Sequence, residues 1–216
     1  MEFDKLVVSF LADEVVGGFF ISVPPGNIAC VYDRGRGVLP RVWGPGLHLK
    51  IPFWQVVKLF NAQIIEFSIR EGFDFSGNKE ALGDTPVHCT TADGIDIKIE
   101  GSILFRIDRH NAPELWENIG ENVVSKVVRP VSRSKIANVV SDITLDQLKF
   151  HRQKVEELIA GALNEYFQFR GIDCEGFLLS RVVKVTAQGE QPVVDGVDHE
   201  HVLERVRDGK NEEIIE

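Results

Sequence analysis

Residues 95–107 show the most regular pattern of apolar and polar positions in the chain. Apolar residues stand at positions 95, 97, 99, 103, 105 and 107, and polar residues at 96, 98, 100, 102 and 106. A period of two is typical of a β-strand with one buried face, so this segment is predicted to be a long strand. The Asp93-Gly94 pair just before it predicts a tight hairpin turn to a strand over residues 87–91.

The first third of the chain is predicted to be rich in short strands. Apolar, β-prone runs separated by Gly, Pro and Asp indicate strands over residues 19–23, 27–32, 47–51, 56–59 and 64–69. Gly44, Pro45 and Gly46 predict a tight turn before the third of these, and Pro52 ends it. Residues 70–86 are predicted to form a loop because Gly, Ser, Asn, Asp and Pro recur there.

From residue 111 the pattern changes to a helical period. Asn111 is predicted to cap a helix that runs to Gly120. Apolar residues then follow a helical stripe from residue 123 to residue 140, and Pro130 inside it predicts a kink or a break. Ser132 and Lys135 are predicted to lie on the solvated side of the helix that carries this stripe.

Two more elements complete the predicted domain. Thr144 with Gln147 three residues later predicts a capping box at the start of a helix. The helical spacing continues to Phe167, Gly171 is predicted to stop it, and a last strand is predicted over residues 172–185. Strands followed by helices and a returning strand predict the α+β class.

The two ends of the chain differ from the middle. Residues 186–216 carry nine acidic and three basic residues with few apolar ones, so we expect an acidic, solvated tail with at most a short helix around 199–207. Residues 6–23 approach the length of a membrane span, but Asp13 and Glu14 at their centre disfavour one. We expect an amphipathic or packed helix over 4–16, which either lies in a membrane interface or docks on the domain. Phe10, Phe19 and Phe20 are the predicted contacts with a membrane or a neighbouring chain.

Composition narrows the classes of function. The 216 residues are 44% hydrophobic and 26% charged, as in a globular protein, and the net charge is −9. This balance argues against nucleic-acid binding and against a polybasic anchor on anionic lipid. Cys30, Cys89 and Cys174 are widely spaced, so we expect buried thiols in a reducing compartment rather than disulfides or a zinc site.

No motif in the sequence predicts a catalytic residue, a bound metal or a cofactor. Ser132 and Lys135 form an SxxK pattern, but the partner motifs of serine acyl-transfer enzymes are absent from the sequence. The run at residues 198–201, Asp-His-Glu-His, is a candidate metal cluster that a solvated tail explains better. Arg34, Arg36 and Arg41 are interpreted as part of a solvent-facing turn.

The order of these features resembles the SPFH or band-7 family, which includes stomatin, prohibitin and flotillin. The residues that carry the resemblance are the VPPG stretch at 23–26 with the strand after it, and the GPGLHLKIPF stretch at 44–53. The strand ending in ILFRI at 103–107 and the segment 128–148, which is most similar to prohibitins, extend it. The resemblance covers residues 19–185, with residues 1–18 as an apolar N-terminal segment and 186–216 as the tail.

The resemblance implies an α+β SPFH domain in two lobes, a strand-rich one followed by an α/β lobe. It implies a non-enzymatic scaffold that forms homo-oligomers on the cytoplasmic, reducing face of a membrane and regulates membrane proteins such as proteases. The alternative is a soluble cytoplasmic SPFH module that binds a partner without membrane contact. Under either reading, Gly44, Pro45 and Gly46 are expected to form the structural turn of the family motif. Family members usually have a membrane segment before the domain and a coiled coil after it. Here residues 6–20 are interrupted by acidic residues and the acidic tail shows no heptads, so we expect a minimal member or one module of a larger assembly.

Overall fold

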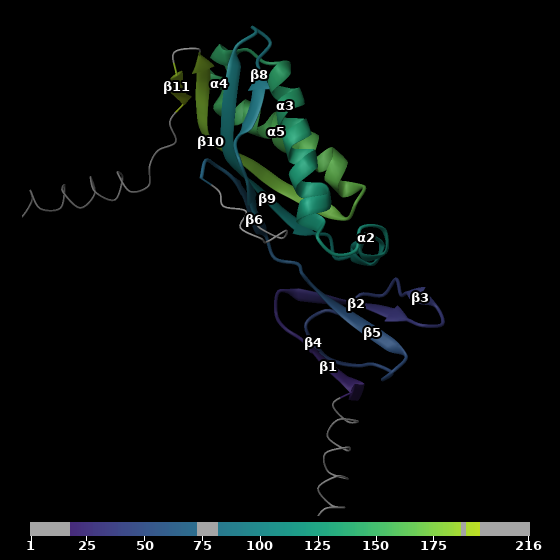
Figure 1. Ribbon diagram of the computed structural model, residues 1–216. Helices are drawn as coiled ribbons and strands as arrows, with labels where there is room; N and C mark the ends of the chain where they lie inside the picture. The colour runs from purple at the N-terminus through teal and green to yellow at the C-terminus, as the bar shows by residue number, and fades with distance from the viewer. Residues whose placement is uncertain (1–17, 73–81, 187–188, 195–216) are drawn as a thin grey trace, which may run out of the picture.

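A computed structural model describes residues 18–72, 82–186 and 189–194 of the chain (Figure 1). The first five strands form an N-terminal lobe made of two small sheets. Strands β1 and β4 form an antiparallel ribbon, and the other three strands form a sheet in the order β3-β2-β5. The bounds of these strands are β1 Phe20–Val23, β2 Asn27–Asp33, β3 Gly37–Val38, β4 Gly46–Leu49 and β5 Gln55–Asn61.

A C-terminal lobe follows, built on a six-stranded mixed sheet. The order is β11-β10-β9-β6-β7, and β8 also pairs with β9. Only β6 and β7 run parallel among these described pairs. The bounds are β6 Ile65–Ile69, β7 Gly83–Asp84, β8 Val87–Thr90, β9 Asp96–Ile107, β10 Ile172–Thr186 and β11 Gly189–Val194.

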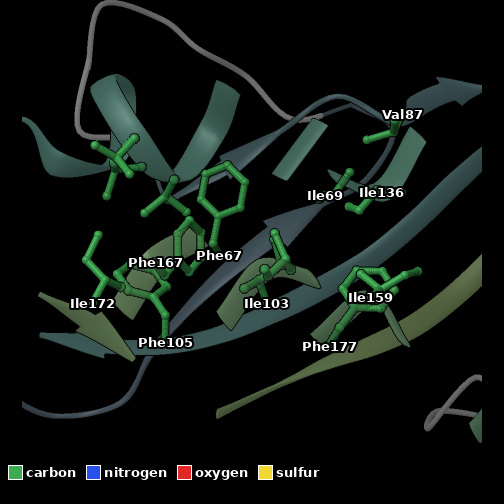
Figure 2. Packing of buried hydrophobic residues seen from close by; sticks show 14 of the residues in the cluster. Phe67, Ile69, Val87, Ile103, Phe105, Ile136, Ile159, Phe167, Ile172 and Phe177 are labelled. Carbon is green, nitrogen blue, oxygen red and sulfur yellow. The ribbon is translucent and has the colours of Figure 1, made fainter. Parts of the chain in front are cut away.

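Helices cover one face of this sheet and close the main core. They are α2 Ala112–Asn118, the π-helix η1 Val124–Val128, α3 Arg129–Ser141, α4 Leu145–Phe150 and α5 Arg152–Gln168. Figure 2 shows apolar side chains of the sheet, such as Phe67, Ile103 and Phe105, packed against Ile159 and Phe167 of α5. The architecture is α+β, as the sequence predicted, and the alternation over 95–107 is confirmed by β9, whose odd positions 97, 99, 103, 105 and 107 are buried.

Local signals account for several helix boundaries. Thr144 and Gln147 form the predicted capping box at the start of α4. Asn111 precedes α2 as predicted but makes no side-chain cap bond, because its amide donates to Asp108 Oδ2 at 2.6 Å instead. The break expected near Pro130 takes the form of a change from π-helix η1 to α-helix α3, with Pro130 in the first turn of α3.

Three predictions are corrected by the structure. The loop predicted over 70–86 contains strand β7, and the first part of the predicted tail contains strand β11, which pairs with β10. Ser132 does not lie on a solvated face: it is fully buried, and its hydroxyl donates to the Val128 carbonyl oxygen and, at 3.1 Å, to the Arg129 carbonyl oxygen. Its position in the row of buried residues 124, 128, 132, 136 and 140 explains this, because residues four apart share a helix face.

The two lobes meet where β5 approaches α2 and the segment after it. The rings of Phe60 and Trp116 pack edge to face with centroids 6.3 Å apart. The Lys58 ammonium lies 2.5 Å from the Glu121 carboxylate on the surface beside them. Apolar and ionic contacts therefore both join the lobes.

Candidate functional site

An exposed apolar surface lies on the ribbon of β1 and β4. Phe20 pairs with Leu49, and Ser22 with Leu47. Directly paired residues, and residues two apart on one strand, point to the same side of a sheet. Phe20, Leu47 and Leu49 therefore share one side, which faces solvent: Leu47 is 70% exposed and Leu49 65%.

The turn after β4 continues this surface. Ile51 and Phe53, which follow β4 in the chain, are apolar and exposed as well, and the Phe53 side chain is 87% exposed. We call Phe20, Leu47, Leu49, Ile51 and Phe53 the apolar face. Burying such side chains is worth about 1.5–3 kcal/mol each, so leaving the face uncovered is costly.

Phe53 has an unusual backbone conformation. Its φ of 63° lies in the left-handed region, which a bulky side chain rarely occupies. Two hydrogen bonds between Ile51 and Gln55, the residues that flank the turn, close it around Phe53. The Gln55 backbone N–H donates to the Ile51 carbonyl oxygen at 2.9 Å, and the Ile51 N–H donates to Gln55 Oε1 at 3.0 Å. These bonds hold an exposed aromatic ring in a strained position, a pattern that clusters at functional sites.

Asp33 at the end of β2 anchors the same turn from the neighbouring sheet. Its carboxylate accepts bonds from the Gly35 N–H at 2.9 Å, from Trp54 Nε1 at 3.1 Å and from Gln55 Nε2 at 3.1 Å. These donors lower the pKa of Asp33, and the largest effect comes from the side chain of Gln55. The ionised carboxylate therefore fixes Trp54 beside the apolar face.

The inner side of the ribbon packs on the lobe. The imidazole of His48 stacks on the Trp43 ring at a centroid distance of 5.1 Å, and His48 Nε2 lies 2.7 Å from the Gly44 carbonyl oxygen. Trp43 in turn exchanges two backbone hydrogen bonds of 2.9 Å with Ala29 of β2. Gly44, Pro45 and Gly46 form the turn between these contacts, and Gly46 has a φ of 130°.

Part of this site was predicted from the sequence. Phe20 belongs to the apolar face, and Phe19 beside it is also exposed, whereas Phe10 lies outside the described residues. Leu47, Leu49, Ile51 and Phe53 were missed, although their spacing of two is visible in the sequence. Alternation shows that one side of a strand is apolar, but it does not show whether that side is covered.

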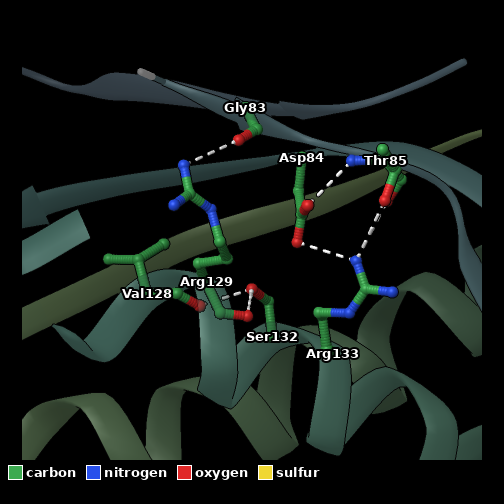
Figure 3. Close-up of polar contacts among 7 residues, drawn as sticks. All are labelled: Gly83, Asp84, Thr85, Val128, Arg129, Ser132 and Arg133. Atoms are coloured by element: carbon green, nitrogen blue, oxygen red, sulfur yellow. Dashed lines mark hydrogen bonds and ion pairs between the residues drawn. The ribbon is translucent and has the colours of Figure 1, made fainter. Parts of the chain in front are cut away.

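The SxxK residues form no nucleophilic site. The buried Ser132 hydroxyl bonds to backbone oxygens, and the Lys135 ammonium lies over the Tyr166 ring, 5.7 Å from its centroid. Figure 3 shows the neighbouring arginines joining α3 to β7. Arg133 Nη1 donates to Asp84 Oδ2 at 2.9 Å, and Arg129 Nη2 donates to the Gly83 carbonyl oxygen at 3.2 Å. These contacts hold the helix on the sheet.

The remaining candidates from the sequence add no second site. All three cysteines are free, and burial raises the pKa of Cys30 and Cys174 to about 11 and that of Cys89 to about 12, which disfavours reactive thiolates. Arg34, Arg36 and Arg41 are exposed, as expected of a solvent-facing turn. The Asp-His-Glu-His run at 198–201 lies outside the described residues, and the described part of the chain brings no metal-ligating cluster together. Within that part, no helix has the length and apolar character of a membrane span.

Comparisons with known proteins converge on one family. The chain matches the family model described as SPFH domain / Band 7 family over residues 21–189. Prohibitin 1 of Mus musculus is 25% identical over 72% of this chain and 51% of its own length. Prohibitin-4, mitochondrial, of Arabidopsis thaliana is 26% identical over 66% of this chain and 45% of its own length. The chain thus spans about half the length of these curated relatives. Prohibitin-6, mitochondrial, of Arabidopsis thaliana is 20% identical over 95% of this chain and 71% of its own length.

Proposed function

The chain belongs to the SPFH domain / Band 7 family, and we propose that it is a membrane-associated scaffold that contacts the membrane through the apolar face. The exposure of this face carries the proposal. Monomeric soluble proteins rarely leave large contiguous apolar patches uncovered, and those that do use them to bind membranes or other proteins. Phe20, Leu47 and Leu49 lie on one side of a ribbon, and the exposed Phe53 lies in the turn that follows it.

The turn over residues 51–55 supports a membrane as the occupant. Phe53 is exposed in a strained backbone conformation, and the indole of Trp54 beside it has an apolar body and a polar N–H. Aromatic side chains of this kind favour the boundary between headgroups and acyl chains. Asp33 and Gln55 fix the turn before contact, which reduces the ordering cost of insertion.

We further propose that copies of the chain assemble with one another and that the assembly regulates membrane proteins such as proteases. The support for this part is membership of the family and similarity to prohibitins. We propose no catalytic role, because the Ser132 hydroxyl is committed to backbone oxygens. Three free cysteines support a location on the reducing, cytoplasmic face of the membrane.

The alternative is a soluble SPFH module whose apolar face binds a protein partner. Flotation of the full chain with its native membranes, followed by sizing of the fraction that contains it, separates the two. Co-flotation as a large oligomer supports the scaffold. A chain that stays in the soluble fraction as a monomer or dimer contradicts the scaffold and favours the alternative.

A further inference from the structure

Positive charge gathers in the N-terminal lobe of an otherwise acidic chain. Residues 18–64 contain five Lys and Arg residues and one acidic residue, Asp33, which gives this segment a net charge of +4. The whole chain carries −9, so the other residues together carry −13. The net charge of the whole chain argued against an anchor on anionic lipid, but it does not describe the N-terminal lobe, which is basic.

Three of the cations flank the apolar face. Lys50 stands between Leu49 and Ile51 in the chain, so alternation directs its side chain to the side opposite theirs, and its backbone N–H donates to the Phe19 carbonyl oxygen at 2.7 Å. Arg34 and Arg36 lie in the turn between β2 and β3, and the Arg34 N–H donates to the Trp54 carbonyl oxygen at 3.2 Å. Cationic residues thus adjoin both the ribbon and the aromatic turn through the backbone.

In the part of the chain that the structure describes, ion pairs hold none of these three cations, although the charge of Arg36 helps to lower the pKa of Asp33. Within the described ranges, no carboxylate forms an ion pair with the side chains of Lys50, Arg34 or Arg36. The one acidic residue of the lobe, Asp33, is buried and accepts bonds from Gly35, Trp54 and Gln55.

We propose that the apolar face and these flanking cations together bind the anionic headgroup surface of a phospholipid bilayer. This inference rests on the proposed membrane contact and names its lipid class. Apolar side chains would enter the interface while Lys50, Arg34 and Arg36 remain at the level of the phosphates. Figure 1 shows β1 and β4 on the side of the N-terminal lobe that faces away from the C-terminal lobe.

Vesicle sedimentation of the full-length chain tests the inference. Vesicles of phosphatidylcholine alone are compared with vesicles that also contain phosphatidylglycerol, at low and high salt. Each basic residue at an anionic surface strengthens binding about fivefold. We expect the triple variant R34Q/R36Q/K50Q to lose on the order of 100-fold in binding to the anionic vesicles at low salt and to match the unmodified chain on neutral vesicles. The control R109Q/K149Q/K154Q removes the same charge from exposed residues of the C-terminal lobe and should bind like the unmodified chain.

The outcomes separate this inference from the proposed function. Equal binding of the unmodified chain to both vesicle types, or equal losses in the triple variant and its control, overturns the anionic preference and leaves membrane contact standing. No binding to either vesicle type overturns both. Far-UV circular dichroism of both variants confirms that they fold, and loss of the anionic preference of the unmodified chain at high salt supports the inference without any substitution.

Discussion

The carboxylate of Asp33 accepts a hydrogen bond from the indole Nε1 of Trp54 across 3.1 Å. Asp33 ends β2 and Trp54 precedes β5, so this bond ties the three-stranded sheet to the turn that presents Phe53. A buried carboxylate is a rigid anchor only while its donors remain in place and its charge is kept. The shape of the apolar face therefore depends on one ionised side chain behind it.

Replacing Asp33 should loosen Trp54. In a background in which Trp43 and Trp116 are Phe, Trp54 is the single tryptophan of the chain and can be excited selectively over the two tyrosines. We expect Asp33→Ala to shift its emission to longer wavelength and to increase its quenching by acrylamide, because the indole loses its acceptor. Unchanged emission and quenching would show that the turn is held without Asp33.

The same anchor should respond to acid. The pKa of Asp33 is lowered in the folded state, so its contribution to the free energy of unfolding is present above its unfolded pKa of about 4 and is lost as the pH falls through the folded value. The difference in Tm between the unmodified chain and Asp33→Asn should be constant near neutral pH and should shrink below about pH 4. A difference that stays constant or widens in acid would contradict this linkage.

Gly46 should be required in the turn before β4, whereas Gly44 should not. Gly46 has a φ of 130°, a conformation that L side chains rarely adopt, although a Cβ there would meet no atom within 4 Å. Gly46→Ala should lower the free energy of unfolding by about 1–3 kcal/mol through backbone strain. Gly44→Ala, which also meets open space but has no positive φ, should change it by about 0.5 kcal/mol or less in urea denaturation. Equal losses in both variants would rule out backbone strain at Gly46 as the cause.

Gly101 should be needed for close strand packing in the C-terminal lobe. It pairs with Leu179 and with Ile69, and an added Cβ would lie 2.5 Å from the Leu178 carbonyl oxygen. Gly101→Ala should cost about 1–3 kcal/mol in the free energy of unfolding, because backbone must shift to admit the methyl group. Gly176→Ala in the neighbouring β10 meets open space and should be nearly neutral. The comparison fails if the two variants unfold at the same urea concentration.

Local signals explain what the sequence could predict of this fold. The alternation of β9 and the capping box of Thr144 and Gln147 depend on residues close in the chain, and both were found. Strands β7 and β11 carry no alternation long enough to detect: β7 has two residues, and β11, GEQPVV, is a short strand that forms a hairpin with the end of β10. Ser132 was misplaced because a polar residue was assigned to the polar side, although its spacing of four from Val128 and Ile136 places it on the buried row.

The candidate site was predictable only in part for a related reason. The aromatic residues Phe19 and Phe20 stand out in the sequence, and both are exposed. The outward orientation of Leu47 and Leu49 depends on the other side of the ribbon, where His48 stacks on Trp43 and Val23 is buried. Tertiary packing decides which side of an alternating strand is covered.

Flotation of two matched variants with vesicles tests membrane contact through the apolar face most directly. Phe53 and Phe169 are 87% and 86% exposed, but Phe53 lies on the apolar face and Phe169 at the end of α5 in the other lobe. Removing solvent-exposed rings at these two positions should disturb folding equally little. We predict that Phe53→Asp abolishes or strongly reduces recovery with the vesicles, while Phe169→Asp floats like the unmodified chain. Equal recovery of both variants and the unmodified chain would contradict the proposed role of the apolar face.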